Sequence, residues 1–267
     1  MWAVKLLALA AIVYLLVLAA FYFAQTALLF PARQVQPPGA LPAGAERLGL
    51  DLPGGERLHG VRIPGDGESR AIVLAFGGNG WNAQNTAIYI HGLAPAHDVI
   101  AFHYRGYAPS GGKPGAAALL GDAPFIYDNI AARLGPRPVI AVGLSIGGGV
   151  AAHLAKRRPL AGLILVTPFD SLRKVASDQF RWLPVGLLLR HDIRPIDDLR
   201  GATLPVALIA AGRDTLIPAA RSAPLRDIVG NLILDSNISE AGHNDIYQNP
   251  AFQAAFKLAL ERIERQQ

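Results

Sequence analysis

Residues Val139–Gly149 read Val-Ile-Ala-Val-Gly-Leu-Ser-Ile-Gly-Gly-Gly, and the next residues, Val150–Lys156, have a helical composition. A strand that enters a G-x-S-x-G turn and leaves it as a helix is the setting in which a strained turn exposes a serine hydroxyl. Ser145 is therefore the predicted nucleophile, because free amides at the helix N-terminus also favour a developing oxyanion. A glycine-rich helix start that serves only close packing is the alternative interpretation.

Short apolar runs alternate with longer Ala- and Leu-rich stretches on both sides of this turn, which is typical of alternating strands and helices. The predicted strands are 48–52, 58–63, 71–76, 99–103, 139–142, 163–166, 206–210 and 232–234, and the predicted helices include 116–133, 147–158, 219–228 and 251–265. The first two strands are expected to form an antiparallel hairpin. Repeated βα units predict an α/β fold, a mostly parallel sheet with helices on both faces, whose ligands bind beyond the carboxyl ends of the strands.

A serine nucleophile needs a base that a carboxylate orients, and two loops downstream of Ser145 offer these groups. Asp214 follows the predicted strand 206–210, and His243 follows 232–234, in a loop that Gly242 allows to approach closely. Asp235 is the main rival acid, because it is also predicted to follow a strand. The weaker rivals are Asp197, Asp198 and Asp245. The remaining histidines are interpreted as surface or structural residues: His59, His91, His97, His103, His153 and His191.

A glycine-rich turn, residues 77–82, follows the predicted strand 71–76 and can expose backbone amides. The amides of Asn79 and Ile146 are the predicted oxyanion-hole donors. A phosphate-binding loop is the alternative, but no G-x-x-x-x-G-K-[ST] pattern follows the turn. The predicted reaction is acyl transfer to water through an acyl-serine, which requires no metal and no organic cofactor. The chain has no cysteine, which excludes a Cys nucleophile and thiolate metal sites.

The N-terminal segment explains why hydrophobic residues reach 51% of the chain. The residues from Leu6 to Ala24 are all apolar and would span about 28 Å as a helix, close to the thickness of a bilayer. Residues 1–24 are therefore predicted to be a single-pass transmembrane anchor, with a cleaved secretory signal as the alternative. Lys5 and the α-amino group favour a cytoplasmic N-terminus and a catalytic domain on the non-cytoplasmic side.

Residues 31–44 are rich in Pro, Gly and Ala, which is typical of a linker or a first loop, so residues 25–44 are predicted to be a linker and residues 45–267 to form one domain. The stretch 170–203 exceeds a simple βα connection and contains several large apolar residues. It is interpreted either as a small cap over an acyl pocket or as a helix packed on the sheet. The net charge of +5 is scattered and indicates a solvated basic surface suited to anionic lipid rather than nucleic acid.

The spaced motifs resemble those of the α/β-hydrolase superfamily, and more narrowly its membrane-anchored bud-emergence-46-like branch, related to α/β-hydrolase domain-containing proteins 12, 13 and 17. The motifs are Gly77-Gly78-Asn79-Gly80-Trp81-Asn82, Tyr104-Arg105-Gly106-Tyr107, Gly143-Leu144-Ser145-Ile146-Gly147-Gly148, Thr167-Pro168-Phe169, Gly212-Arg213-Asp214 and Gly242-His243, with Leu29-Phe30-Pro31 after the anchor. Two positions depart from that branch. Gly77 replaces a usual His in the oxyanion turn, and His103 replaces a usual Asp before Tyr104.

This resemblance implies a membrane-tethered serine hydrolase that cleaves a carboxylic ester, a thioester or a lipid acyl bond. Its substrate would be a small molecule or a lipid acyl compound. Two other classes stay open: an aminopeptidase-like serine peptidase of the same fold, and a non-catalytic binding protein that retains the fold.

Overall fold

The computed structural model describes residues 1–67 and 71–267. In that part of the chain one 8-stranded sheet has the order β1-β2-β4-β3-β5-β6-β7-β8. The strands are β1 (Glu46–Asp51), β2 (Arg57–Ile63), β3 (Ile72–Phe76), β4 (Asp98–Phe102), β5 (Val139–Leu144), β6 (Gly162–Val166), β7 (Val206–Ala211) and β8 (Leu232–Ile238). β1 and β2 form the predicted antiparallel hairpin, β2 pairs antiparallel with β4, and the remaining pairs are parallel.

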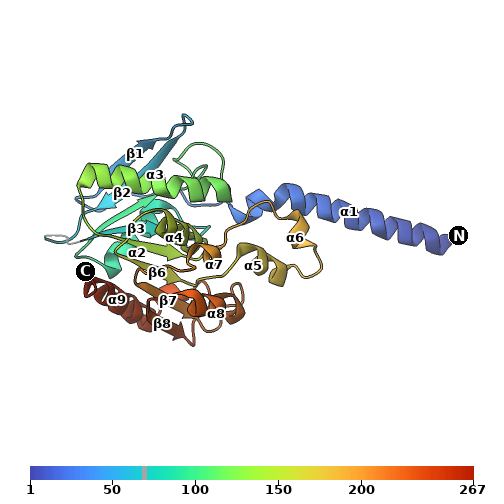
Figure 1. Cartoon of the computed structure of the whole chain (residues 1–267). Coiled ribbons are helices and arrows are strands. Elements are labelled where there is room, and N and C mark those ends of the chain that lie inside the picture. The colour runs from blue at the N-terminus through green and yellow to red at the C-terminus, as the bar shows by residue number, and fades with distance from the viewer. Residues whose placement is uncertain (68–70) are drawn as a thin grey trace.

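Helices cover both faces of the sheet (Figure 1). The α-helices of the described residues are α1 (Trp2–Leu29), α2 (Ala83–Leu93), α3 (Ala116–Leu134), α4 (Ile146–Arg157), α5 (Leu172–Gln179), α6 (Val185–Leu188), α7 (Pro195–Asp198), α8 (Ala219–Ile228) and α9 (Pro250–Glu264), of which α1 does not cover the sheet. One buried apolar cluster joins the sheet to α3, α4 and α8, and a second joins it to α2 and α9. Side chains along β5 alternate between the two clusters, as the period of a strand requires. The predicted α/β fold with a mostly parallel sheet is confirmed.

α1 projects away from the rest of the chain, and its C-terminal end lies beside α6 and α5 (Figure 1). Among the described residues it is the one helix long and apolar enough to cross a membrane, and its most apolar stretch is 0% buried. The helix continues to Leu29 and so includes residues 25–29, which the composition predicts to be part of the linker. The side chains of Gln25 and Thr26 hydrogen-bond to the segment between α6 and α7, which holds this end of the helix against the rest of the protein.

Most predicted strands differ from the structure by one or two residues at an end, and the larger departures are at α2 and β8. α2 is not among the predicted helices, because Thr86, Tyr89 and Ile90 have only modest helix propensity. The helix forms because its apolar side packs against the sheet. β8 continues to Ile238, well beyond the predicted end at residue 234. Asp235 therefore lies inside a strand, and the prediction that it follows one is wrong.

Candidate active site

Ser145 lies between the end of β5 and the start of α4, with φ 52° and ψ −119°, a conformation that non-glycine residues rarely adopt. Close packing forces this turn. A Cβ atom on Gly143 would overlap the Cα atom of Gly148, and one on Gly147 would overlap the carbonyl oxygen of Phe76. Both glycines of the G-x-S-x-G pattern are therefore required, and the backbone strain at Ser145 amounts to about 1–3 kcal/mol.

Side chains from the loops after β5, β7 and β8 form a chain of hydrogen bonds. The Nε2 atom of His243 lies 3.0 Å from the Oγ atom of Ser145, and its Nδ1 atom lies 2.7 Å from the Oδ2 atom of Asp214. The Oδ1 atom of Asp214, which is buried, accepts from the amides of Leu216 and Ile217 at 2.9 and 2.7 Å. Because a carboxylate only accepts, Nδ1 of His243 carries the proton and Nε2 can accept the Ser145 proton.

The glycine-rich turn after β3 passes beside Ser145. A Cβ atom on Gly78 would lie 3.8 Å from the Cβ atom of Ser145, and Asn79 is the next residue. Ile146 is the first residue of α4, where a helix amide has no partner within the helix. The structure thus brings the turn that contains Asn79 and the amide of Ile146 to the same sheet edge as Ser145.

Two tyrosines hold the glycine-rich turn from the loop after β4. The hydroxyl of Tyr104 donates to the carbonyl oxygen of Gly77 at 2.7 Å, and that of Tyr107 donates to the carbonyl oxygen of Asn79 at 3.0 Å. Both side chains lie largely inside the protein, and burial raises the pKa of each hydroxyl. In the sequence these tyrosines stand out only as part of a motif. Their position at the end of a neighbouring strand is the signal that could have suggested this role.

The rival acids have other partners. The Oδ2 atom of Asp235 accepts from Nε of Arg226 at 2.7 Å, on the solvent-exposed side of β8. The others are Asp197, which pairs with Arg194, Asp198, which pairs with His153 and Lys156, and Asp245, which accepts from the amide of Gly242. Among the described residues, no group of three or more His, Asp or Glu side chains is arranged to hold a metal ion.

His103 is one of the two positions that depart from the bud-emergence-46-like pattern, and its burial makes the free energy of unfolding depend on pH. Burial, with the charges of His59 and Arg47, lowers its pKa to about 4, whereas an unfolded histidine titrates near about 6.5. Between these values the unfolded chain binds a proton that the folded chain does not, so stability falls by about 3 kcal/mol as the pH falls through this window. We expect His103→Gln to remove most of that loss.

The measurement is denaturant unfolding of both proteins at about pH 7 and about pH 4.5. The free energy of unfolding should drop less in the His103→Gln variant than in the unmodified chain. An equal drop in the two proteins would mean that His103 does not stay neutral in the folded state.

Comparison with known proteins identifies several that are similar in sequence. A family model described as serine aminopeptidase, S33, matches residues 67–192. An uncharacterised protein from Mycobacterium tuberculosis is 32% identical over 211 residues, which cover 77% of this chain and 74% of that protein. The lysophosphatidylserine lipase ABHD12 from Danio rerio is 31% identical over 150 residues, which cover 49% of this chain and 39% of the lipase. That match therefore spans less than half of the lipase.

Solved structures with the same architecture have lower identity. An alpha-beta hydrolase from Vibrio vulnificus aligns with a TM-score of 0.70 at 20% identity, over 92% of each chain. A membrane phospholipase A, described as a bacterial virulence factor, aligns with a TM-score of 0.62 at 18% identity, over 98% of this chain and 97% of its own. At these identities the likeness establishes the fold alone.

Proposed function

This chain belongs to the α/β-hydrolase family, in agreement with the resemblance of its motifs, and from that premise we propose that it is a serine hydrolase that cleaves an ester or thioester bond of a lipid acyl group at a membrane. The observation that carries the proposal is the chain of contacts from Asp214 through His243 to Ser145. The relative ABHD12 is named as a lysophosphatidylserine lipase, which supports a lipid as the substrate.

In the proposed reaction the Oγ atom of Ser145 attacks the acyl carbonyl carbon while Nε2 of His243 takes the hydroxyl proton. The tetrahedral intermediate then collapses, and His243 returns the proton to the leaving oxygen or sulfur, which leaves an acyl-Ser145. Water attacks this ester with His243 as the base, releases the free acid and restores Ser145. Asp214 keeps the proton of the neutral ring on Nδ1 and stabilises the imidazolium.

The oxyanion of the intermediate is proposed to accept hydrogen bonds from the amides of Asn79 and Ile146. Each such donor contributes about 2.7–4 kcal/mol to transition-state stabilisation. The tyrosine contacts to the glycine-rich turn support this assignment, because they hold the backbone on which Asn79 lies. No step of this route needs a metal or an organic cofactor.

The membrane part of the proposal assigns residues 1–24 to a single bilayer crossing, residues 25–44 to the connection and residues 45–267 to the hydrolase domain. An exposed apolar helix such as α1 is costly in water and supports this assignment. Lys5 places a positive charge near the N-terminal end of the helix, so we assign that end to the cytoplasm and the hydrolase domain to the other side.

Peptide amides are the second candidate substrate class, because the matching family model is described as a serine aminopeptidase. An aminopeptidase needs acidic groups that bind the free amine of its substrate. The acidic residues nearest to His243 in the sequence already have partners: Glu240 pairs with Arg213, and Asp245 accepts from Gly242. This favours an ester over a peptide.

A fluorophosphonate probe tests the proposal on the full-length protein in membranes. We expect covalent labelling of Ser145 and no labelling of the Ser145→Ala variant, because only an activated serine attacks the phosphorus atom. Release of fatty acid from a lysophospholipid, compared with release of an amine from an aminoacyl amide, then separates the two substrate classes.

The control is a known serine hydrolase in the same membranes. If the control is labelled and Ser145 is not, the chain is a non-catalytic member of the family. If only the amide is cleaved, the peptidase alternative replaces the proposed lipid hydrolase.

A further inference from the structure

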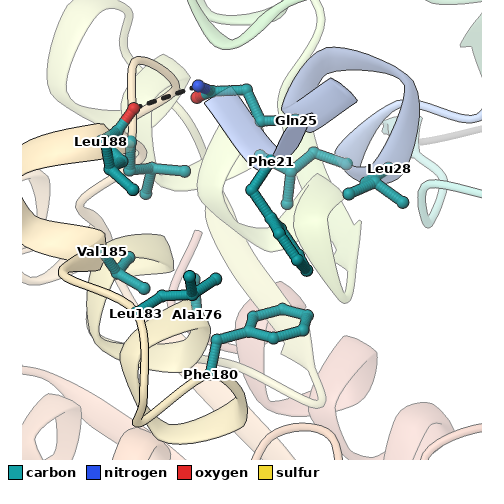
Figure 2. A pocket seen from close by; sticks show the side chains of 10 residues that line it. Phe21, Gln25, Leu28, Ala176, Phe180, Leu183, Val185 and Leu188 are labelled. Atoms are coloured by element: carbon teal, nitrogen blue, oxygen red, sulfur yellow. Dashed lines mark hydrogen bonds between the residues drawn. The ribbon is translucent and has the colours of Figure 1, made fainter. Parts of the chain in front are cut away.

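An apolar pocket opens between the C-terminal end of α1 and the segment that carries α5 and α6 (Figure 2). Its cavity volume is about 70 Å³, and the cavity is open to the outside on one side. The wall from α1 includes Phe21, Leu28 and Leu29, and the opposite wall includes Phe180, Leu183 and Leu188. The pocket therefore exists only because α1 lies against this segment.

Hydrogen bonds fix α1 in this position. The Nε2 atom of Gln25 donates to the carbonyl oxygen of Leu188 at 3.0 Å, and its Oε1 atom accepts from the amide of Arg190 at 2.7 Å. The Oγ1 atom of Thr26 lies 2.7 Å from Nε2 of His191. An amide side chain buried in an apolar helix is costly unless both of its ends are paired. Gln25 is therefore suited to holding the helix against the protein, beyond any role in anchoring.

Each wall of the pocket also contacts a loop of the candidate active site. The Nδ2 atom of Asn79, in the oxyanion turn, donates to the carbonyl oxygen of Leu29 at 3.4 Å. On the other side, Nε2 of Gln179 at the end of α5 donates to the carbonyl oxygens of Thr215 and Leu216, in the loop that follows Asp214. The pocket is thus built on the same two loops that flank Ser145.

The outer side of the segment carries large apolar residues beside α1. The ring of Phe21 lies 5.2 Å from the ring of Phe180 and 5.7 Å from that of Trp182. Trp182 and Leu187 are 54% and 88% exposed. Such exposed apolar side chains next to a helix suited to a bilayer indicate that the mouth of the pocket faces the membrane.

We propose that this pocket holds the acyl chain of a membrane lipid, so that α1 forms one wall of the substrate site as well as tethering the protein. The inference rests on the proposed hydrolase function and names its substrate as a long-chain acyl lipid that enters from the bilayer. An acyl chain matches the lining, since the polar side chain there, Gln25, has both of its ends hydrogen-bonded. The ester group of the lipid would then lie toward the loops around Ser145.

The experiment compares hydrolysis of a four-carbon and a sixteen-carbon ester by the full-length protein. Ala176→Trp places a large ring in the pocket, and Ala132→Trp adds the same ring at an exposed position of α3 that does not line it. We expect Ala176→Trp to lower kcat/KM for the long ester by at least about 10-fold relative to the short one. Ala132→Trp should leave that ratio unchanged. Phe21→Trp repeats the test from the α1 wall if Ala176→Trp does not fold.

The short ester separates this inference from the proposed function, because its hydrolysis needs the catalytic residues but not the pocket. Activity on the short ester with the same chain-length ratio in all variants would overturn the inference and leave the function intact. Absence of activity on both esters would count against the function. In that case saturable binding of radiolabelled palmitate to the Ser145→Ala variant, lost on addition of Ala176→Trp, would still support the pocket, and its absence would overturn it.

Discussion

Asp214→Asn is expected to lower kcat for ester hydrolysis by about 10⁴-fold without unfolding the chain. The oxygen of the new amide can still accept from the amides of Leu216 and Ile217, which the Oδ1 atom of Asp214 now accepts. Its NH₂ group would then face Nδ1 of His243, where a carboxylate oxygen lies 2.7 Å away at present. Because NH₂ only donates, His243 would carry its proton on Nε2 and could no longer accept the proton of Ser145.

Asp235→Asn is the matched control for this prediction. The carboxylate of Asp235 pairs with Arg226 and is 39% exposed, so its loss should change stability by less than about 1 kcal/mol and leave kcat nearly unchanged. The two variants are assayed on the same ester, with circular dichroism to verify folding. If Asp235→Asn removes activity and Asp214→Asn retains it, the assignment of the acid is wrong.

Local patterns account for the part of this site that the sequence could predict. Val139–Gly149 combines an apolar run with the two glycines of the G-x-S-x-G pattern, and a helix follows, so the strand, the turn and the position of Ser145 follow from neighbouring residues alone. Asp214 and His243 could be proposed because parallel strands bring their following loops to one edge of the sheet. The end of β8 was harder to predict, because Asp235, Ser236 and Asn237 have low strand propensity. They are part of the strand because they pair with β7.

The position of α1 could not be predicted from any local pattern. Composition indicated an apolar helix that ends in a linker. Gln25 finds its partners at Leu188 and Arg190, more than 160 residues further along the chain, and only the fold brings those backbone groups to it. A lone polar residue near the end of an apolar helix can either contact the rest of the protein or face the lipid headgroups. The sequence around Gln25 does not distinguish these two roles.

Ser145→Ala and Ser145→Gly are both expected to lower activity by about 10⁶-fold, because each removes the proposed nucleophile. They should nevertheless differ in stability. Alanine must keep φ near 52°, whereas glycine adopts that conformation without strain. Relief of about 1–3 kcal/mol of strain exceeds the extra entropy of glycine in the unfolded chain, about 0.5–1 kcal/mol. The glycine variant should therefore be the more stable by about 1 kcal/mol, as measured by denaturant unfolding.

Ser177 provides the control, because it lies in α5, where glycine is less stable than alanine by about 1 kcal/mol. The Gly–Ala difference should therefore have opposite signs at the two serines. The same sign at both positions would mean that the turn at Ser145 relaxes once the side chain is lost, and that its strain depends on the contact between the hydroxyl and His243. Opposite signs would mean that the strain lies in the backbone itself. The close contacts of Gly143 and Gly147 would then maintain the strained turn whatever side chain stands at position 145. The fold would thus lose some stability in order to expose one hydroxyl group.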